Sequence, residues 1–516
     1  MLFNSHVFIF GLLPIGLVVF LAILALGYRR LAIGWLVAVS LFFYGWWNPP
    51  YLVLLGISAV FNFTVGRLLS RARDQTPGIA RGMLTLGVVS NLAALGWFKY
   101  ANFFVDTINV SLGQSFHLET IVLPLAISFF TFQQIAYLVD AQRGIAREYD
   151  FLDYLLFVTF FPQLIAGPIV HHKEMLPQFE ALQIRRKHVE HLAIGATIFF
   201  IGLFKKVILA DSIAGYATPV FSASEAGLAL SFFEAWIGAL SYTFQLYFDF
   251  SGYSDMAIGI ARMFGIRLPL NFHSPYKSEN IIEFWRRWHM TLSRFLREYL
   301  YFSLGGNRRG PLLRYRNLML TMILGGLWHG AGWTFVIWGA LHGLYLVVNH
   351  GFQNLRLTLK PGHQSGVTSR MLARGVTFTS VVVAWVFFRA ESVPGAMNLL
   401  SSMVGANGFA VPDTAETLVS ALPWVDFTFT SQAFFSLEAL VSIVGLGLIV
   451  TIAPNTQQFM SRFDPAFDTY SGDSPNATSG WMTWEPTVSW AVGCSVLAAI
   501  ALMVLSRVSE FLYFQF

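Results

Sequence analysis

Long hydrophobic segments recur along the chain, and short polar segments separate them. A helix that crosses a bilayer needs roughly 18 to 20 mostly apolar residues. The segments that approach or exceed this length are 2–27, 31–48, 51–66, 82–98, 121–139, 151–169, 190–210, 228–248, 317–350, 375–388, 435–453 and 488–506. This pattern predicts an all-α, polytopic integral membrane protein, with about eleven transmembrane helices and additional re-entrant or amphipathic helices.

The composition supports a membrane protein. Hydrophobic residues make up 55% of the 516 residues, charged residues make up 12%, and the mean hydropathy is +0.58. The first segment lacks the charged start and the small-residue cleavage site of a signal peptide, so we expect it to remain as a span. The lone cysteine, Cys494, excludes an internal disulfide, and no histidine pair has a zinc-binding spacing, so we expect no metal site.

The positions of Lys and Arg predict the orientation of the chain, because short basic loops stay in the cytoplasm. Basic residues gather at 29–30, 67–81, 171–187, 286–316 and 356–374, whereas the turn at 47–50 and the segment 391–434 carry none. This alternation predicts a periplasmic N-terminus and cytoplasmic basic loops. The net charge of +5 then reflects topology and lipid contact, since no nucleic-acid-binding motif is present.

The apolar run from Asn317 to His350 encloses two imidazoles, His329 and His342, before it ends at a third. A titratable ring in membrane-length apolar sequence is costly to bury and is usually held there for function. If both flanking basic groups are cytoplasmic, the run must enter and leave on one side, as two helices joined near Gly330–Gly332. His329 is then a candidate catalytic base, because imidazole accepts protons near neutral pH. The alternative is a tightly packed helix pair in which glycines permit close approach and His329 bonds a neighbour.

A second polar group interrupts the hydrophobic segment around residues 242–256. Asp249 and Asp255 stand there beside Gln245 and Tyr253. Carboxylates at this depth need partners. They form either a polar wall that orients an imidazole or contacts substrate, or a buried network that braces helices.

The segment 280–300 predicts an amphipathic helix at the cytoplasmic interface. Asn280 and Glu283 have capping-box spacing, and Gly305–Gly306 end the helix. Phe284, Trp288, Leu292, Phe295 and Tyr299 line one face, and Arg286, Arg287, Arg294 and Arg297 occupy others. These arginines bind either anionic lipid or the phosphates of a coenzyme, and His289 among them could contact a thioester. No Walker A loop or dinucleotide fingerprint occurs, which argues against an ATP-driven pump or a nicotinamide enzyme.

Several motifs in order resemble the membrane-bound O-acyltransferases, within about residues 1–350 and more loosely at 387–391. They are Met1-Leu-Phe-Asn-Ser, Tyr247-Phe-Asp-Phe-Ser-Gly-Tyr-Ser-Asp-Met-Ala257, Phe284-Trp-Arg-Arg-Trp-His-Met-Thr-Leu-Ser293, Leu304-Gly-Gly-Asn-Arg308 and Gly325-Gly-Leu-Trp-His-Gly-Ala331. The chain is most similar to the bacterial branch that contains the integral-membrane subunit of alginate O-acetylation and the D-alanyl transferase of teichoic acid.

The resemblance implies a single membrane domain with a ring of helices around a central chamber. Residues 1–350 would form its catalytic core, and 351–516 would add helices with polar loops at 405–432 and 455–487. The family's invariant histidine falls on His329 and its second histidine on His289. Residues expected to line the chamber are Gln245, Asp249, Tyr253, Asp255 and Trp328, and the four arginines of 286–297 are expected to bind the donor.

The implied activity is O-acetylation of an exopolysaccharide such as alginate or acetylated cellulose. Acetyl would come from a cytoplasmic donor, with acetyl-CoA as the expected donor and no tightly bound cofactor. It would pass across the bacterial inner membrane to a periplasmic acetyltransferase. His329 would deprotonate the acceptor hydroxyl, and His289 or Tyr253 would stabilise the oxyanion. The competing hypotheses are a transporter with a proton relay through His329, Asp249 and Asp255, and a non-catalytic scaffold.

Overall fold

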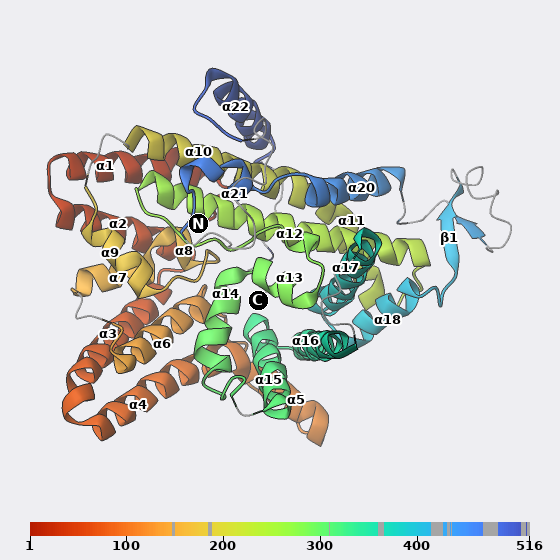
Figure 1. The fold of residues 1–516 in the computed structure, drawn as a ribbon, viewed down its shortest axis with the longest axis horizontal. Coiled ribbons are helices and arrows are strands. Elements are labelled where there is room, and N and C mark those ends of the chain that lie inside the picture. The colour runs from red at the N-terminus through yellow and green to blue at the C-terminus, as the bar shows by residue number, and fades with distance from the viewer. Residues whose placement is uncertain are drawn as a thin grey trace. The chain divides into compact units, whose positions relative to one another are not determined.

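The structure is a computed structural model of the chain, and it is predominantly helical (Figure 1). It describes residues 1–146, 150–183, 188–308, 310–359, 366–413, 427–430, 434, 436–467, 483–506 and 512. The chain forms two compact units, each built from separate segments of sequence. The prediction of a single membrane domain with a boundary near residue 350 is not tested by this division and stays a prediction.

Unit 1 contains residues Met1–Leu203, Tyr253–Asn271 and Thr456–Ser506. Its helices α3, α4 and α6 pack side by side, as Figure 1 shows. The buried amides of Asn62 and Asn91 join α3 to α4 through two reciprocal hydrogen bonds of 3.1 and 2.6 Å. Its elements are η1 (Phe8–Leu12), α1 (Leu13–Ala25), α2 (Arg29–Gly45), α3 (Tyr51–Gln75), α4 (Pro77–Leu95), η2 (Gly96–Tyr100), α5 (Ala101–Leu112), α6 (Ile127–Arg143), α7 (Phe151–Thr159), α8 (Phe161–Leu164), α9 (His172–Glu180), α10 (His188–Phe204), α21 (Thr456–Phe459), η7 (Ser461–Phe463) and α22 (Val488–Met503).

Unit 2 contains residues Phe204–Gly252, Phe272–Asn455 and Arg507–Phe516. Large aromatic side chains fill its core, among them the fully buried Tyr242, Trp338 and Trp385. The helix α12 (Phe232–Met263) gives its first part to this unit and its second part to unit 1. The other elements are η3 (Lys205–Ala210), α11 (Asp211–Glu225), η4 (Pro275–Lys277), α13 (Ile281–Arg287), α14 (Met290–Phe295), η5 (Leu296–Tyr301), α15 (Pro311–His329), α16 (Trp333–Leu359), α17 (Val367–Arg389), α18 (Val393–Met403), β1 (Phe409–Pro412), β2 (Phe427–Thr430) and α20 (Leu437–Ile452).

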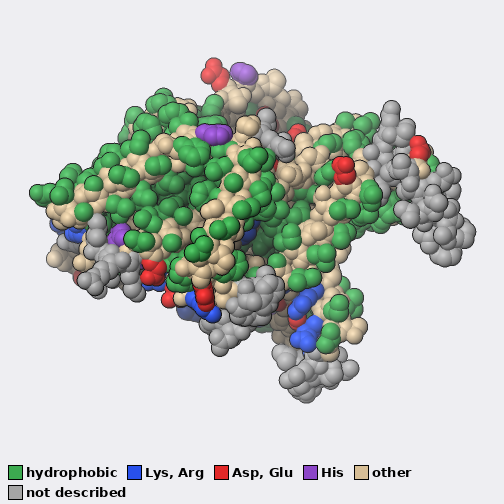
Figure 2. All heavy atoms as spheres, turned by 90° about the horizontal axis from the view of Figure 1, so that it is seen from above, with side chains coloured by type: hydrophobic (Ala, Val, Ile, Leu, Met, Phe, Trp, Pro, Cys, Tyr) green, Lys and Arg blue, Asp and Glu red, His purple; other side chains and the backbone are tan. Residues whose placement is uncertain are grey.

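Within the described residues, six helical stretches are long and apolar enough to cross a membrane. They are Phe8–Ala25, Tyr51–Gln75, Pro77–Leu112, His188–Glu225, Trp333–Arg356 and Val367–Arg389, and Leu437–Ile452 and Val488–Met503 are shorter apolar helices. The sequence predicted about eleven crossings. Helices α2 and α6, with 17 residues each, are shorter than the required length, and buried polar residues such as Asp249 lower the hydropathy of the longer α12. The face shown in Figure 2 is covered largely by hydrophobic side chains, as the surface of a membrane protein is.

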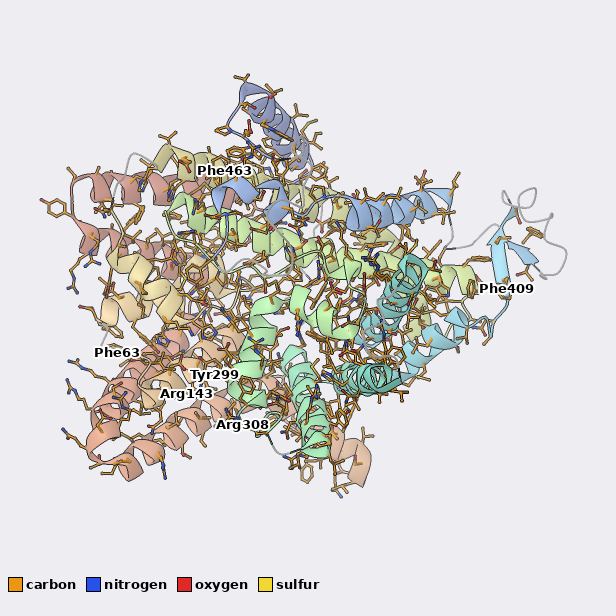
Figure 3. The ribbon with its side chains drawn as sticks, in the orientation of Figure 1. Phe63, Arg143, Tyr299, Arg308, Phe409 and Phe463 are labelled. Carbon is orange, nitrogen blue, oxygen red and sulfur yellow. The ribbon has the colours of Figure 1, made fainter. Side chains whose placement is uncertain are left out.

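One short parallel β-pair lies where the sequence predicted a polar loop. β1 pairs with β2 in the register Phe409↔Phe427, within the segment 405–432. Phe409, labelled in Figure 3, packs against Phe232 with ring centroids 5.2 Å apart. The backbone N–H of Phe232 also donates to the carbonyl of Gly408 at 3.0 Å. These contacts fix β1 at the start of α12.

The predicted helical hairpin is present. α15 ends at His329, and α16 begins at Trp333 after the turn at Gly330–Gly332. The two helices are in close contact because glycine faces glycine. A Cβ on Gly326 would lie 3.2 Å from the Cα of Gly339, and one on Gly339 would lie 2.9 Å from the Cα of Ile323. The sequence analysis considered a turn and, as an alternative, a close approach of the two helices through their glycines. The structure contains both.

We expect Gly339→Val to destabilise the hairpin by about 1 to 3 kcal/mol, because its side chain must push the backbones of two helices apart. Thermal unfolding of the detergent-solubilised protein measures this change. The matched control is Gly351→Val on the same helix, where a Cβ meets nothing within 4 Å. Equal thermal stability of the two variants would contradict the close-packing role.

Candidate active site

His329 is the last residue of α15, and its side chain is 5% exposed. The following residue, Gly330, has φ −157°, an extended conformation that any residue adopts. Gly330 is therefore needed for space and not for backbone freedom. A Cβ at Gly330 would collide with the ring of Phe335. The first residue of the turn thus lets Phe335 pack directly against the backbone that follows His329.

His289 lies at a break in what the sequence predicted to be one amphipathic helix. α13 ends at Arg287, α14 begins at Met290, and His289 between them has φ 42° and ψ 54°. This left-handed conformation is uncommon for a residue other than glycine and costs roughly 1 to 3 kcal/mol. The single continuous helix was therefore a wrong prediction. The break turns His289 inward, where it is fully buried.

The ends of the segment agree better with the sequence. The side chain of Asn280 accepts a hydrogen bond from the backbone N–H of Glu283 at 3.0 Å, as an N-cap should. Glu283 does not complete the predicted box, because its carboxylate accepts from the N–H of Glu279 at 2.9 Å instead. η5 ends at Tyr301, and Gly305 and Gly306 follow with φ 106° and 57°.

The structure brings the two predicted catalytic histidines together. The ring centroids of His289 and His329 are 6.3 Å apart. Phe250 of α12 packs edge-on against His289 at 4.8 Å, and Trp328 lies 6.3 Å from the same imidazole. Trp338 and Phe388 each lie 5.2 Å from His329. The two imidazoles thus lie edge to face, with 61° between their planes, inside an aromatic enclosure. Electrostatic interactions are strong in such an enclosure because water is scarce.

His342 belongs to the same aromatic cluster, but one of its ring nitrogens already accepts a hydrogen bond. Trp338 separates it from His329, with its ring 4.8 Å from His342. The indole N–H of Trp285 donates to Nδ1 of His342 at 3.3 Å. Because indole can only donate, Nδ1 must carry the lone pair, and in a neutral ring the proton sits on Nε2. The basic nitrogen of His342 is therefore already occupied.

Asp249 is paired with a lysine that sequence reasoning did not single out. The ammonium of Lys206 lies 2.7 Å from Asp249 and 2.7 Å from Asp211, and the side chains of Lys206 and Asp249 are almost fully buried. This arrangement supports the bracing interpretation of Asp249, since the network ties α12 to η3 and α11. A signal was available in the sequence, because Lys205 and Lys206 interrupt the apolar run that begins at 190.

The other polar residues of α12 have separate surroundings. Gln245 is buried in unit 2. Tyr253 and Asp255 belong to unit 1, where Tyr253 stacks on Phe3 at 4.7 Å. The carboxylate of Asp255 accepts a hydrogen bond of 2.6 Å from the hydroxyl of Thr456. Roles for these residues in the chamber stay predictions.

The four predicted donor-binding arginines differ in their contacts. Arg287 pairs with Glu283 at 2.8 Å and donates to the carbonyl of His273 at 3.3 Å, so it braces α13. Arg297 lies 3.5 Å from Glu298. Arg286 is exposed, and Arg294 is half-buried. Arg286 and Arg297 are therefore the more accessible candidates for an anionic ligand.

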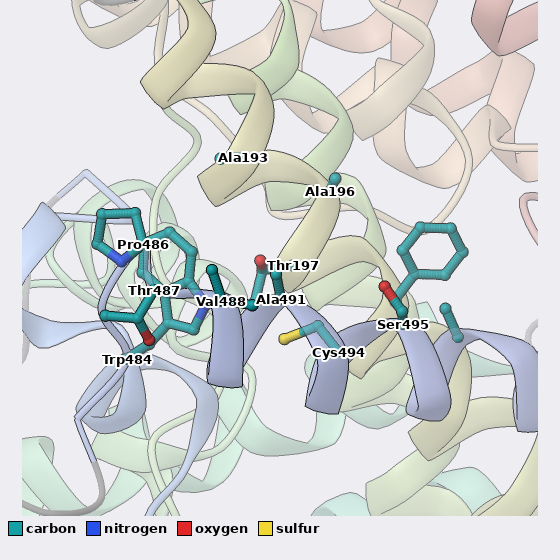
Figure 4. Close-up of a pocket in the computed structure, with 12 residues that line it drawn as sticks. Ala193, Ala196, Thr197, Trp484, Pro486, Thr487, Val488, Ala491, Cys494 and Ser495 are labelled. Atoms are coloured by element: carbon teal, nitrogen blue, oxygen red, sulfur yellow. The ribbon is translucent and has the colours of Figure 1, made fainter.

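A pocket of about 490 Å³ opens in unit 1 between α10 and α22 (Figure 4). Ala193 and Thr197 of α10 face Ala491 and Cys494 of α22 across it, and Trp484 closes one end. Its lining includes none of the residues that the sequence predicted for the site. The described residues also contain no group of three His, Cys, Asp or Glu side chains that could hold a metal ion.

The structure thus combines several helices that are long and apolar enough to cross a membrane with a pair of buried histidines that could transfer a proton. The sequence model of the membrane-bound O-acyltransferase family, MBOAT, matches residues 80–365, more than half of the chain. The chain therefore belongs to this family, and it is an O-acyltransferase and a multi-pass membrane protein, as the resemblance implied.

Three named relatives are similar to this chain, two of them over its whole length. The peptidoglycan O-acetyltransferase of Helicobacter pylori is 41% identical, over 100% of this chain and 98% of its own length. The probable alginate O-acetylase AlgI of Azotobacter vinelandii is 40% identical over 100% of both chains. The teichoic acid D-alanyltransferase of Streptococcus thermophilus is 27% identical over 51% of this chain and 68% of its own.

We expect Lys206→Met to destabilise the protein by about 3 to 5 kcal/mol, because it leaves two carboxylates without their shared ammonium. The thermal unfolding midpoint and the folded yield in detergent report this loss. Lys205→Met, at the partly exposed neighbouring position, serves as the control. The double variant Lys206→Met with Asp249→Asn should recover part of the loss, and its failure to do so would argue against a bracing role.

Proposed function

We propose that this protein transfers acetyl from a cytoplasmic donor, acetyl-CoA, to an acceptor hydroxyl that serves the O-acetylation of a cell-surface glycan. The observation that carries the proposal is the 6.3 Å separation of His289 and His329 inside the aromatic enclosure. The names of the full-length relatives support acetyl as the transferred group. Those names give two polymers, peptidoglycan and alginate, so the class of acceptor is a glycan of the cell envelope.

In the proposed reaction, His329 removes the proton of the acceptor hydroxyl while its oxygen attacks the thioester carbonyl. The carbon–sulfur bond then breaks, and the proton held by His329 passes to the departing thiolate. Such a general base contributes typically about 10² to 10⁴ in rate. His289 donates a hydrogen bond to the developing oxyanion, a contribution of about 10² to 10³. No acyl-enzyme is required.

The donor would approach from the cytoplasmic side, and the acetyl group would leave toward the periplasm of a bacterial inner membrane. The exposed Arg286 and Arg297 supply positive charge for the phosphates of acetyl-CoA. A periplasmic acetyltransferase then passes the acetyl group to the polymer. The names of the alginate O-acetylase relatives support a place in such a polysaccharide-modifying system.

The alternative, a transporter with a proton relay, needs Asp249 as a mobile proton carrier. The two close contacts of Lys206 with Asp249 and Asp211 hold that carboxylate as a charged partner instead. Purified protein with labelled acetyl-CoA and a hydroxyl acceptor separates the two hypotheses, because only an acyltransferase releases free coenzyme in proportion to acetylated product.

We expect His329→Ala to lower the rate of acetyl transfer at least about 100-fold, because it removes the general base. His289→Ala should be severe as well, and His342→Ala milder, since Trp285 already occupies the basic nitrogen of His342. Coenzyme release by the purified variants measures the three effects, and gel filtration confirms that each variant is folded. Activity above about a tenth of wild type in His329→Ala would favour a packing role.

The proposed orientation predicts which loops an impermeant thiol reagent can label in intact cells. In a Cys494→Ser background, a cysteine at the exposed position Asn407 should react, and one at the exposed position Ser369 should not. Both should react after the membrane is permeabilised. The reverse pattern in intact cells would invert the orientation and the direction of acetyl flow.

A further inference from the structure

A groove of about 490 Å³ lies on the surface of the α15–α16 hairpin, which Figure 1 shows as two neighbouring helices. Leu312, Leu313 and Met319 of α15 form one wall, and Leu344 and Val347 of α16 form the other. Arg316 brings one charged side chain into this otherwise apolar lining, beside the phenol of Tyr315. The groove therefore presents a hydrophobic channel and a cation together.

The guanidinium of Arg316 is held in a defined position. Its Nε and Nη2 groups donate to the side-chain oxygen of Asn317 at 3.2 and 2.9 Å. Asn317 is buried, and its amide donates to the carbonyl of Gly306 at 2.9 Å, which fixes the orientation of the oxygen. A preorganised guanidinium loses little conformational entropy when it binds an anion.

Positive charge is in excess around this end of the groove. Within the described part of the chain, Arg316 has no carboxylate at ion-pair distance, whereas Arg287, Arg297 and Arg374 each have one. Arg314, two residues before Arg316, is bonded to the imidazole of His350 at 2.7 and 3.0 Å rather than to an acid. An anion at Arg316 would therefore meet a guanidinium whose charge no carboxylate in the described part of the chain balances.

Apolar side chains on the outside of the same helices indicate what surrounds the groove. Leu344 is 48% exposed, Val348 is 60% exposed and Leu312 is 79% exposed. In a membrane protein such a surface faces hydrocarbon. A ligand that fits both features needs an acyl chain for the channel and an anionic group for the arginine.

We propose that the α15–α16 groove binds an anionic phospholipid, with its phosphate on Arg316 and one acyl chain between Met319 and Val347. Such a lipid would bridge the two helices that carry His329 and His342. Because it binds the folded hairpin, it would stabilise the hairpin by mass action. This proposal concerns the membrane environment of the protein and does not depend on the acetyl-transfer reaction.

The test is lipid retention by the purified full-length protein, measured by native mass spectrometry after reconstitution in nanodiscs of phosphatidylcholine and phosphatidylglycerol. We expect wild type to retain phosphatidylglycerol preferentially. Arg316→Gln should weaken that retention about tenfold, the loss that corresponds to one charge-assisted hydrogen bond. Arg316→Lys, which keeps the charge, should retain part of it. Val347→Trp, which fills the channel, should reduce retention of both lipids.

Arg374→Gln is the matched control, because it removes an exposed positive charge that is paired with Glu279 and lies outside the groove. An equal loss in Arg374→Gln and Arg316→Gln would overturn the proposal in favour of unspecific charge attraction. Equal retention of the two lipids by wild type would overturn it as well. Full displacement of the lipid by soluble glycerol phosphate would show that the site takes a free phosphate instead. Should Arg316→Gln fail to fold, unchanged retention in Val347→Trp still refutes the groove.

Discussion

The contact of Gly326 with Gly339 is the constraint on which the candidate site depends. Two helices approach this closely only where neither carries a side chain at the crossing. The crossing sets the position of α15 against α16, and so places His329, three residues after Gly326, beside Trp338, one residue before Gly339. The same crossing brings Trp338 between His329 and His342. This one steric condition thus places His329 against one wall of its aromatic enclosure, the ring of Trp338.

Chemically identical side chains acquire different roles from their neighbours in this enclosure. His329 and His342 lie thirteen positions apart on one hairpin, and both are buried. His342 accepts the indole N–H of Trp285, which occupies its basic nitrogen. His329 instead lies at the end of its helix opposite His289, whose strained backbone turns it inward. A strained backbone of this kind persists only where the surrounding packing holds it in place, and it is common at functional sites.

Polar groups elsewhere in the hydrophobic helices are satisfied in pairs or small networks. Asn62 and Asn91 exchange amide hydrogen bonds, and Lys206 joins two carboxylates. Such groups are costly to leave unpaired in apolar surroundings. These polar pairs therefore specify which helices pack together. Apolar surface area alone does not distinguish one neighbouring helix from another. Arg314 and Arg316 are exceptions at the protein surface, because no carboxylate among the described residues is paired with them. In the proposed groove, an anionic lipid headgroup would supply the missing negative charge.

The sequence by itself determined the helical class, the membrane location and the hairpin around Gly330–Gly332, and it led to the prediction, which stays a prediction, that His329 and His289 are catalytic. These follow from local properties, because the length of an apolar run, the position of glycines and the cost of a buried imidazole are all readable along the chain. Only the tertiary structure decided the helix break at His289, the pairing of Asp249 with Lys206 and the occupation of His342 by Trp285. Each of these depends on contacts between residues far apart in sequence. The preference of a residue for a local conformation does not indicate which distant residue it will contact. The difference between six apolar spans and about eleven predicted also arises in the tertiary structure, since α2 and α6 are too short to count and the buried α12 carries polar residues.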